Sequence, residues 1–135
     1  MAGYSTTPLG KKLGIKAHSR VRIENAPDNF LDLLHPLPSG IKISTRLRSN
    51  LDIAILFTQS TAELTEQLDV AMRQILQNGM IWVCWPKKAS GILTDVTEDK
   101  VREIALPPGL VDVKVCAIDQ VWSGLKLVIR KSNRK

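Results

Sequence analysis

Residues 51–85 of the chain read LDIAILFTQSTAELTEQLDVAMRQILQNGMIWVCW, and they carry the clearest secondary-structure pattern in the sequence. Leu51–Phe57 is apolar apart from Asp52, which is typical of a parallel strand covered on both faces. Ser60 and Glu63 then have the spacing of a capping box at the start of a helix whose apolar side chains recur every three or four residues. Met80–Trp85 is a second buried strand. This order predicts a strand, helix, strand unit with a parallel pair of strands.

The flanking sequence extends this order on both sides. We expect the helix to end at Asn78-Gly79, and Asp95 with Glu98 three residues later predicts the start of another helix, which Pro107-Pro108-Gly109 ends. The other predicted elements are a helical turn at 9–13, strands at 20–24 and 41–45, a helix at 29–34 capped by Asp28, and antiparallel strands at 111–118 and 125–130. We therefore predict a three-layer α/β fold, with a mostly parallel sheet and a C-terminal antiparallel hairpin strand.

Length and composition indicate one domain. The 135 residues are enough for a single core, so we predict one domain over 1–135, with a polar N-terminal lead-in at 1–19 and a basic tail at 131–135. A hydrophobic fraction of 44% with 24% charged residues is typical of a soluble globular protein. No apolar run approaches the ~20 residues that span a bilayer, and the N-terminus lacks the apolar core of a signal peptide. We expect a cytoplasmic protein without membrane contact.

Cysteine and histidine patterns argue against metal and hydrolase chemistry. Cys84 and Cys116 each lie inside an apolar strand, which favours buried, unreactive thiols over a disulfide framework or a zinc site. His18 and His35 have no Cys, Asp or Glu at ligand spacing. Ser90-Gly91 lacks the leading glycine of a nucleophile elbow, and so does Ser123-Gly124. We predict no metal site and no catalytic residue.

The chain is basic, with 19 Lys and Arg against 13 Asp and Glu and a net charge of +6. Such an excess favours anionic partners without identifying the anion. Three Trp, two Phe and one Tyr are too few to indicate the stacking platform of a single-strand nucleic-acid binder. Basic ends are usually solvated tails, and the alternative is an arm that grips phosphates. The basic groups concerned are Lys11, Lys12, Lys16, Arg46, Arg48, Arg130, Lys131, Arg134 and Lys135.

The run Trp85-Pro86-Lys87-Lys88-Ala89-Ser90-Gly91 follows a buried strand, at the edge where open α/β sheets bind ligands. Two lysines, the Ser90 hydroxyl and the Gly91 amide could bind a phosphate or a carboxylate. The alternative is a solvated loop tip with a turn glycine, because the residue order is not that of a P-loop. At the same edge we expect Asn25, Pro27, 58–60, 86–90 and Asp119. The candidate ligand-binding residues are Lys87, Lys88, Ser90, Gly91, Asn25, Ser60, Trp85 and Trp122, the two tryptophans being partly exposed.

The order of elements from Leu51 to Arg130 resembles the second half of the methyltransferase variety of the Rossmann fold. Leu13-Gly14-Ile15-Lys16, before the strand at 20–24, resembles the lead-in to the first strand of that fold. Methyltransferases of this type have a glycine-rich turn after the first strand and an acidic residue at the end of the second. Here the turn is Asn25-Ala26-Pro27-Asp28, and the second strand ends in Ser44-Thr45-Arg46. The resemblance implies a Rossmann-like fold, and no cofactor is predicted because the S-adenosylmethionine signature is missing.

A second resemblance covers most of the chain and is to a family of small bacterial proteins of unknown function. It implies a bacterial cytoplasmic protein with a Rossmann-like fold, and it carries no activity over. The segments that resemble the family are Gly3-Tyr4-Ser5, Pro8-Leu9, Lys11 to Ile15, Trp85 to Gly91, Thr94-Asp95, Thr97 to Val101, Gly109 to Cys116 and Trp122 to Leu125.

Three functions are consistent with the sequence. The first is a non-enzymatic binding or interaction domain that takes a small anionic ligand or a protein segment at the loop from Lys87 to Gly91. The second is a divergent, methyltransferase-like group-transfer enzyme. The third is a nucleic-acid accessory protein that acts through its basic tails. The oligomeric state cannot be predicted from these residues.

Overall fold

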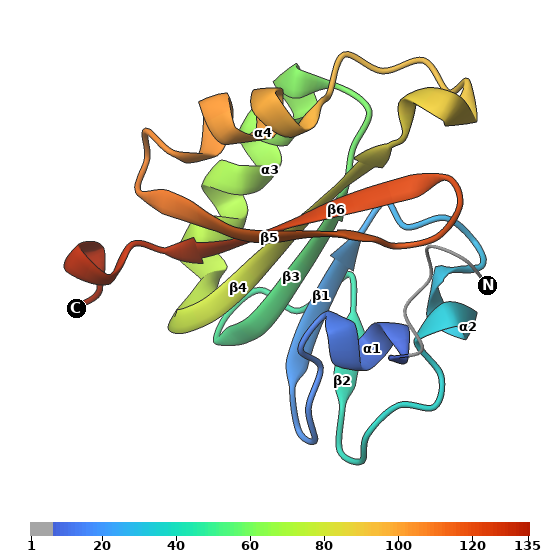
Figure 1. Cartoon of the computed structure of the whole chain (residues 1–135). Coiled ribbons are helices and arrows are strands. Elements are labelled where there is room, and N and C mark those ends of the chain that lie inside the picture. Colours follow the sequence, from blue (N-terminus) through green and yellow to red (C-terminus); the bar gives the residue numbers. More distant parts are fainter. Residues whose placement is uncertain (1–6) are drawn as a thin grey trace.

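A six-stranded sheet with strand order β2-β1-β3-β4-β6-β5 forms the centre of the computed structural model, which describes residues 7–135 (Figure 1). The strands are β1 (Arg20–Glu24), β2 (Lys42–Ser44), β3 (Leu51–Phe57), β4 (Ile75–Pro86), β5 (Leu110–Ala117) and β6 (Trp122–Ile129). The helices are α1 (Leu9–Lys12), α2 (Phe30–Leu34), α3 (Thr61–Gln74) and α4 (Glu98–Ala105), with 3-10 turns at Lys88–Ser90 and Lys131–Asn133.

The sheet is parallel from β2 to β4, and β6 runs antiparallel to both of its neighbours, β4 and β5. This arrangement confirms the predicted α/β fold with a mostly parallel sheet and an antiparallel C-terminal strand. The chain passes from β1 to β2 toward one edge of the sheet, and then crosses back to β3 and continues toward the other edge. The strand order therefore reverses between β1 and β3, which makes this the switch point of the sheet.

Helices cover both faces of the sheet, as Figure 1 shows, with α3 and α4 on one side and α1 and α2 on the other. Leu64 and Leu68 of α3 pack with Val101 of α4 in the first core cluster. Leu13 and Phe30 belong to the second cluster. Strand β3 contributes to both: Leu51, Ala54 and Leu56 to the first, and Ile53, Ile55 and Phe57 to the second.

Helix α3 begins where the sequence predicts and ends earlier. Ser60 is the N-cap, and its Oγ accepts a hydrogen bond from the Glu63 N–H at 3.3 Å. The predicted end at Asn78-Gly79 is wrong, because the helix stops at Gln74. Ile75 is extended, with φ −77° and ψ 152°, and pairs with Leu51 of β3. The Ile75 side chain is buried in the first core cluster. The backbone therefore pairs with β3 at Ile75 instead of continuing the helix for another turn.

Two predicted caps and two predicted exposures are also wrong. Asp28 does not cap α2, since the N-cap position belongs to Asn29 and lacks a side-chain hydrogen bond. The cap of α4 is Thr97, whose Oγ1 accepts from the Lys100 N–H at 3.2 Å, and not Asp95.

Trp85 and Trp122 are 7% and 8% exposed, so both are buried. In a chain with few aromatic residues, their ring area fills the core.

Trp82 ties the N-terminal segment to the middle of the sheet. Its side chain is completely buried on the face that α1 and α2 cover. The indole Nε1 donates a hydrogen bond of 2.9 Å to the Leu13 carbonyl, which directly follows α1. This contact satisfies a buried indole N–H and fixes α1 over β4.

Neither cysteine is part of a disulfide. Cys84 is buried and Cys116 is half-buried, and burial raises the pKa of both thiols. Over residues 7–135, no helix is both long enough and apolar enough to cross a membrane.

Replacing Trp82 by Phe should lower the free energy of unfolding by about 2–3 kcal/mol, because it leaves the Leu13 carbonyl without its donor and opens a small cavity. Urea unfolding followed by circular dichroism measures this loss. The control is Leu93→Ala at a side chain that is 92% exposed, where we expect a change below about 0.5 kcal/mol. A Trp82→Phe variant as stable as the wild type would contradict the anchoring role of the indole.

Candidate functional site

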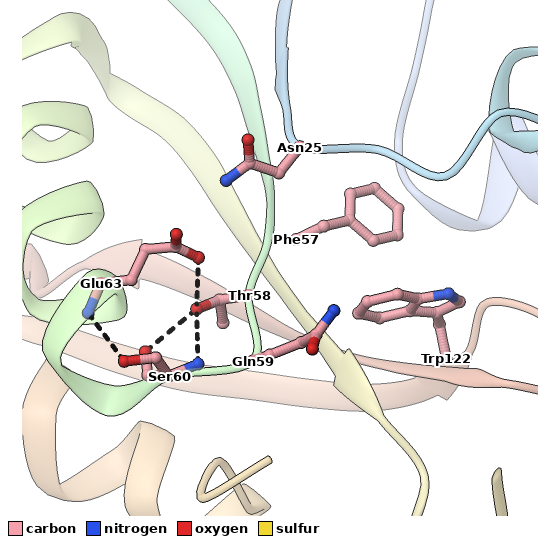
Figure 2. Close-up of a pocket in the computed structure, with 7 residues that line it drawn as sticks. All are labelled: Asn25, Phe57, Thr58, Gln59, Ser60, Glu63 and Trp122. Carbon is pink, nitrogen blue, oxygen red and sulfur yellow. Dashed lines mark hydrogen bonds between the residues drawn. The ribbon is translucent and has the colours of Figure 1, made fainter. Parts of the chain in front are cut away.

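A cleft of about 300 Å³ lies beyond the carboxyl ends of β1 and β3 (Figure 2). We call it the switch-point cleft, because the strand order reverses between these two strands. Ligands of open α/β sheets bind in this position, since the loops that follow the strands diverge there and leave a crevice. The cleft is lined by Asn25, Phe57, Thr58, Gln59, Ser60, Glu63 and Trp122.

Asn25 follows β1 directly and has a left-handed backbone, with φ 58°. Asparagine is one of the few residues with a side chain that adopts this conformation readily. The exposed Asn25 amide lies at the mouth of the switch-point cleft (Figure 2). Asn25 also lines a cavity of about 390 Å³ beside α3 and one of about 480 Å³ at the ends of β1 and β2. Asn25 therefore lines all three cavities.

A hydrogen-bond network of three polar residues holds the floor of the cleft (Figure 2). The Thr58 hydroxyl lies 3.2 Å from Glu63 Oε1 and 3.1 Å from the Ser60 carbonyl, and it accepts from the Ser60 N–H at 3.4 Å. The second carboxylate oxygen of Glu63 has no partner among residues 7–135. The network thus orients Glu63 and leaves one of its oxygens free to accept a hydrogen bond from a ligand.

The N-terminus of α3 is already occupied by an acidic side chain. Asp95 accepts hydrogen bonds of 2.8 Å from both the backbone N–H and the hydroxyl of Thr61. These bonds, the hydroxyl bond first, lower the pKa of Asp95 from its ordinary value. An anionic ligand at this helix end would meet the carboxylates of Asp95 and Glu63. The arrangement favours uncharged or positively charged ligand groups.

Aromatic rings form the opposite wall of the cleft. Phe57 and Trp122 meet edge to face, with their ring centroids 5.1 Å apart. Asp119 holds the backbone just before Trp122 in place, because its Oδ1 accepts hydrogen bonds of 2.8 Å from the backbone N–H groups of Val121 and Trp122. Phe57 and Trp122 are 1% and 8% exposed, so this wall offers a ligand only a small apolar surface.

The loop from Lys87 to Gly91 is held by contacts within the protein. Lys87 Nζ donates to the Asp119 carbonyl at 2.7 Å, and the Lys87 N–H donates to the Val121 carbonyl at 2.7 Å. The Ser90 hydroxyl donates to the Lys87 carbonyl at 2.7 Å and accepts from the Ile92 N–H. Gly91 has φ 75° and ends the 3-10 turn. The exposed ammonium group of Lys88 has no partner in the described part of the chain.

The structure brings together part of the predicted site. Asn25, Ser60 and Trp122 line the switch-point cleft. Trp85 lies in the core cluster under α3 and α4 instead. Lys87, Lys88, Ser90 and Gly91 lie beside the cleft and do not line it.

Sequence reasoning did not single out Gln59 and Glu63 as ligand-binding residues. The sequence feature that indicates a binding role for Gln59 is its position just after a buried strand. Glu63 has two roles, since its backbone N–H completes the Ser60 cap and its carboxylate lines the cleft. A capping pattern alone explains Glu63 fully, so the pattern hides the second role.

The residues around the cleft offer no cluster of metal ligands. In the described part of the chain, no three His, Cys, Asp or Glu side chains are placed to hold a metal ion. An organic ligand has more to bind: the cavity of about 480 Å³ is mainly apolar and opens beside Asn25. It is lined by Ile23, Asn25, Ala26, Pro27, Asp28, Leu31, Ile43, Ser44 and Thr45.

The family described as "Protein of unknown function (DUF3052)" matches residues 44–131, and the chain belongs to this family. No curated protein matches the sequence. Solved structures show that the fold is that of the methyltransferase-like Rossmann domains. A ribosomal protein L11 methylase from Lactobacillus delbrueckii subsp. bulgaricus has a TM-score of 0.60 at 8% identity, over 90% of this chain and 75% of the other. A SAM-dependent methyltransferase from Aquifex aeolicus has a TM-score of 0.63 at 10% identity, over 88% of this chain and 86% of the other.

The contact between Asp95 and Thr61 predicts a specific pH dependence. Because the folded protein lowers the pKa of Asp95, its carboxylate adds stability above its ordinary pKa of 3.8, and this contribution is lost as the pH falls through the lower folded value. Urea unfolding over a pH series should therefore show a steeper loss below pH 3.8 in the wild type than in Asp95→Asn.

The variant Thr61→Val, which removes the hydroxyl donor, should reproduce part of the change seen in Asp95→Asn. Equal acid dependence in the wild type and Asp95→Asn would contradict the contact.

Proposed function

We propose that this member of the DUF3052 family is a non-enzymatic binding domain that holds a small, nucleoside-like ligand in the switch-point cleft. The observation that carries the proposal is the place of the cleft. It opens beyond the carboxyl ends of β1 and β3, where the strand order reverses, and its volume of about 300 Å³ is at the small end of the range for ligand pockets.

The chemistry of the lining supports a ligand with hydroxyl groups and a flat ring. The free oxygen of Glu63 and the amides of Asn25 and Gln59 can bind hydroxyl or amine groups. Phe57 and Trp122 add a small apolar surface against which one edge of a ring can pack. A nucleoside combines these two kinds of surface in one small molecule.

The same lining disfavours an anion in the cleft. No Lys or Arg is among the residues that line it, and Glu63 contributes a negative charge. The small anionic ligand or protein segment expected at Lys87–Gly91 would bind beside the cleft, where Lys88 is exposed and Lys87 already donates to the Asp119 carbonyl. That loop remains the alternative site.

A second candidate function is group transfer by a divergent methyltransferase-like enzyme. The likeness in fold to a SAM-dependent methyltransferase favours it. The turn from Asn25 to Asp28 lacks glycine, and β2 ends without an acidic residue, which are the two places where that cofactor would be held. A non-enzymatic binding function is therefore better supported than group transfer.

Isothermal titration with adenosine tests the proposal. We expect the wild type to bind, and Asn25→Gly and Glu63→Gln each to weaken binding about tenfold through the loss of one hydrogen bond. Glycine is the suitable replacement for Asn25 because it keeps the left-handed backbone. The matched control for the lost carboxylate is Glu103→Gln on α4, which should bind like the wild type.

The other outcomes separate the alternatives. Binding of inorganic phosphate that disappears in Lys87→Ala/Lys88→Ala would support the loop instead of the cleft. Binding of S-adenosylmethionine together with transfer of its methyl group would support the enzyme. The proposal fails if adenosine does not bind, or if Asn25→Gly and Glu63→Gln bind it as tightly as the wild type.

A further inference from the structure

Charge is distributed unevenly along the chain. Residues 1–23 contain five Lys and Arg and no acidic residue, and residues 113–135 contain six Lys and Arg and one acidic residue, Asp119. These two segments thus hold 11 of the 19 basic residues and one of the 13 acidic residues. The acidic residues lie almost entirely between them in the sequence.

The two basic segments meet on one face of the sheet. Trp82 of β4 donates to the Leu13 carbonyl, so α1 lies on the face to which Trp82 points. Lys12 Nζ reaches the carbonyl of Ala117 at the end of β5, at 3.4 Å. Lys126 of β6 is the direct partner of Trp82, so its side chain points to the same face.

Two lysines oppose each other directly on this face. Lys114 of β5 pairs with Lys126 of β6 in the antiparallel ladder. Side chains at such positions are about 5 Å apart at Cβ, and like charges there are unfavourable. Burial raises the pKa of the Cys116 thiol and the charges of Lys12 and Lys114 oppose that rise, so both charges lie near Cys116. We call Lys12, Lys114 and Lys126 the lysine face.

The described residues do not neutralise the lysine face. The ion pairs in this part of the chain involve Arg22, Arg73, Lys100 and Arg102 as their basic members. Asp112, two residues before Lys114, is paired with Arg102, and Asp119 has its Oδ1 engaged by two backbone N–H groups. Lys114 is exposed, so an anion from solution can reach it.

We propose that the lysine face binds the phosphate backbone of a nucleic-acid duplex. Among residues 7–135, Lys114 and Lys126 have no counter-charge and Lys12 contacts only the Ala117 carbonyl, so the three ammonium groups complement a row of phosphates. Each lysine that neutralises a phosphate releases a counterion from the nucleic acid, which adds affinity. A duplex is favoured over a single strand because Trp82, the aromatic residue opposite Lys126 on this face, is completely buried and offers no ring on which a base could stack.

This surface is distinct from the basic tail and from the switch-point cleft. Arg134 Nε donates to the Ile129 carbonyl, and the Lys135 N–H donates to Gln77, so the tail is packed against the protein. None of the three lysines lines the cleft. Duplex binding and ligand binding are therefore independent, and either can fail without the other.

The test is Lys114→Glu, which turns the opposed pair into one of opposite charge. The variant should melt about 1–3 °C higher than the wild type, because a repulsive cross-strand pair becomes attractive. Its affinity for a 20-bp DNA duplex, measured by fluorescence anisotropy, should fall about tenfold. The slope of log K against log salt should change from about −2.7 to about −1.8, with the loss of one of three phosphate contacts.

Lys42→Glu on the edge strand β2 is the matched control, since it changes the net charge equally at the other edge of the sheet. It should keep the wild-type slope, while Lys126→Ala should lose affinity as Lys114→Glu does. An RNA duplex that binds at least as well as DNA would support the same face. The proposal is overturned if the duplex does not bind, if Lys42→Glu weakens binding as much as Lys114→Glu, or if polyglutamate binds as tightly.

Discussion

Strands β3 and β4 are covered on both faces of the sheet, and this burial determines where polar side chains can lie in the fold. Helices α3 and α4 cover one face and α1 with α2 the other, so apolar side chains fill β3 from Ile53 and β4 from Met80 to their last residues. Polar groups appear at Thr58, where β3 ends, and at Lys87, just after β4. The polar groups that follow β3 and β4 therefore lie at the carboxyl edge of the sheet. The cleft opens at this edge, where the strand order reverses beside β1.

The fold could be predicted because its signals are local and strong. The apolar runs at β3 and β4, the Ser60 cap and the alternation in β5 and β6 each specify one kind of element. The errors fall where tertiary contacts decide the outcome. Ile75 continues the helical apolar pattern, yet its backbone pairs with Leu51. Asp95 has the sequence spacing of a cap, yet it binds Thr61 on a different helix.

The site was harder to predict, since the cleft combines the residue after β1, the end of β3 and the loop after it, and residues of α3 and β6. The general rule for open sheets placed Asn25 and Ser60 at the correct edge. It also placed Lys87 and Ser90 there, and these residues hold a turn. A sequence shows that a loop is basic, and it does not show whether the charged groups are already used within the protein. Lys114 and Lys126 pose the converse problem, because only the strand register brings them together.

The carboxyl edge between β1 and β3 is the ligand site that we propose for this protein. The most direct measurement is a ¹⁵N–¹H correlation spectrum of the labelled protein during titration with adenosine. Binding in the switch-point cleft should progressively shift the amide signals of Asn25, Gln59, Ser60 and Glu63 and the Trp122 indole signal, while the amide signals of α4 stay in place. Shifts confined to residues 87–91, or none at all, would contradict it.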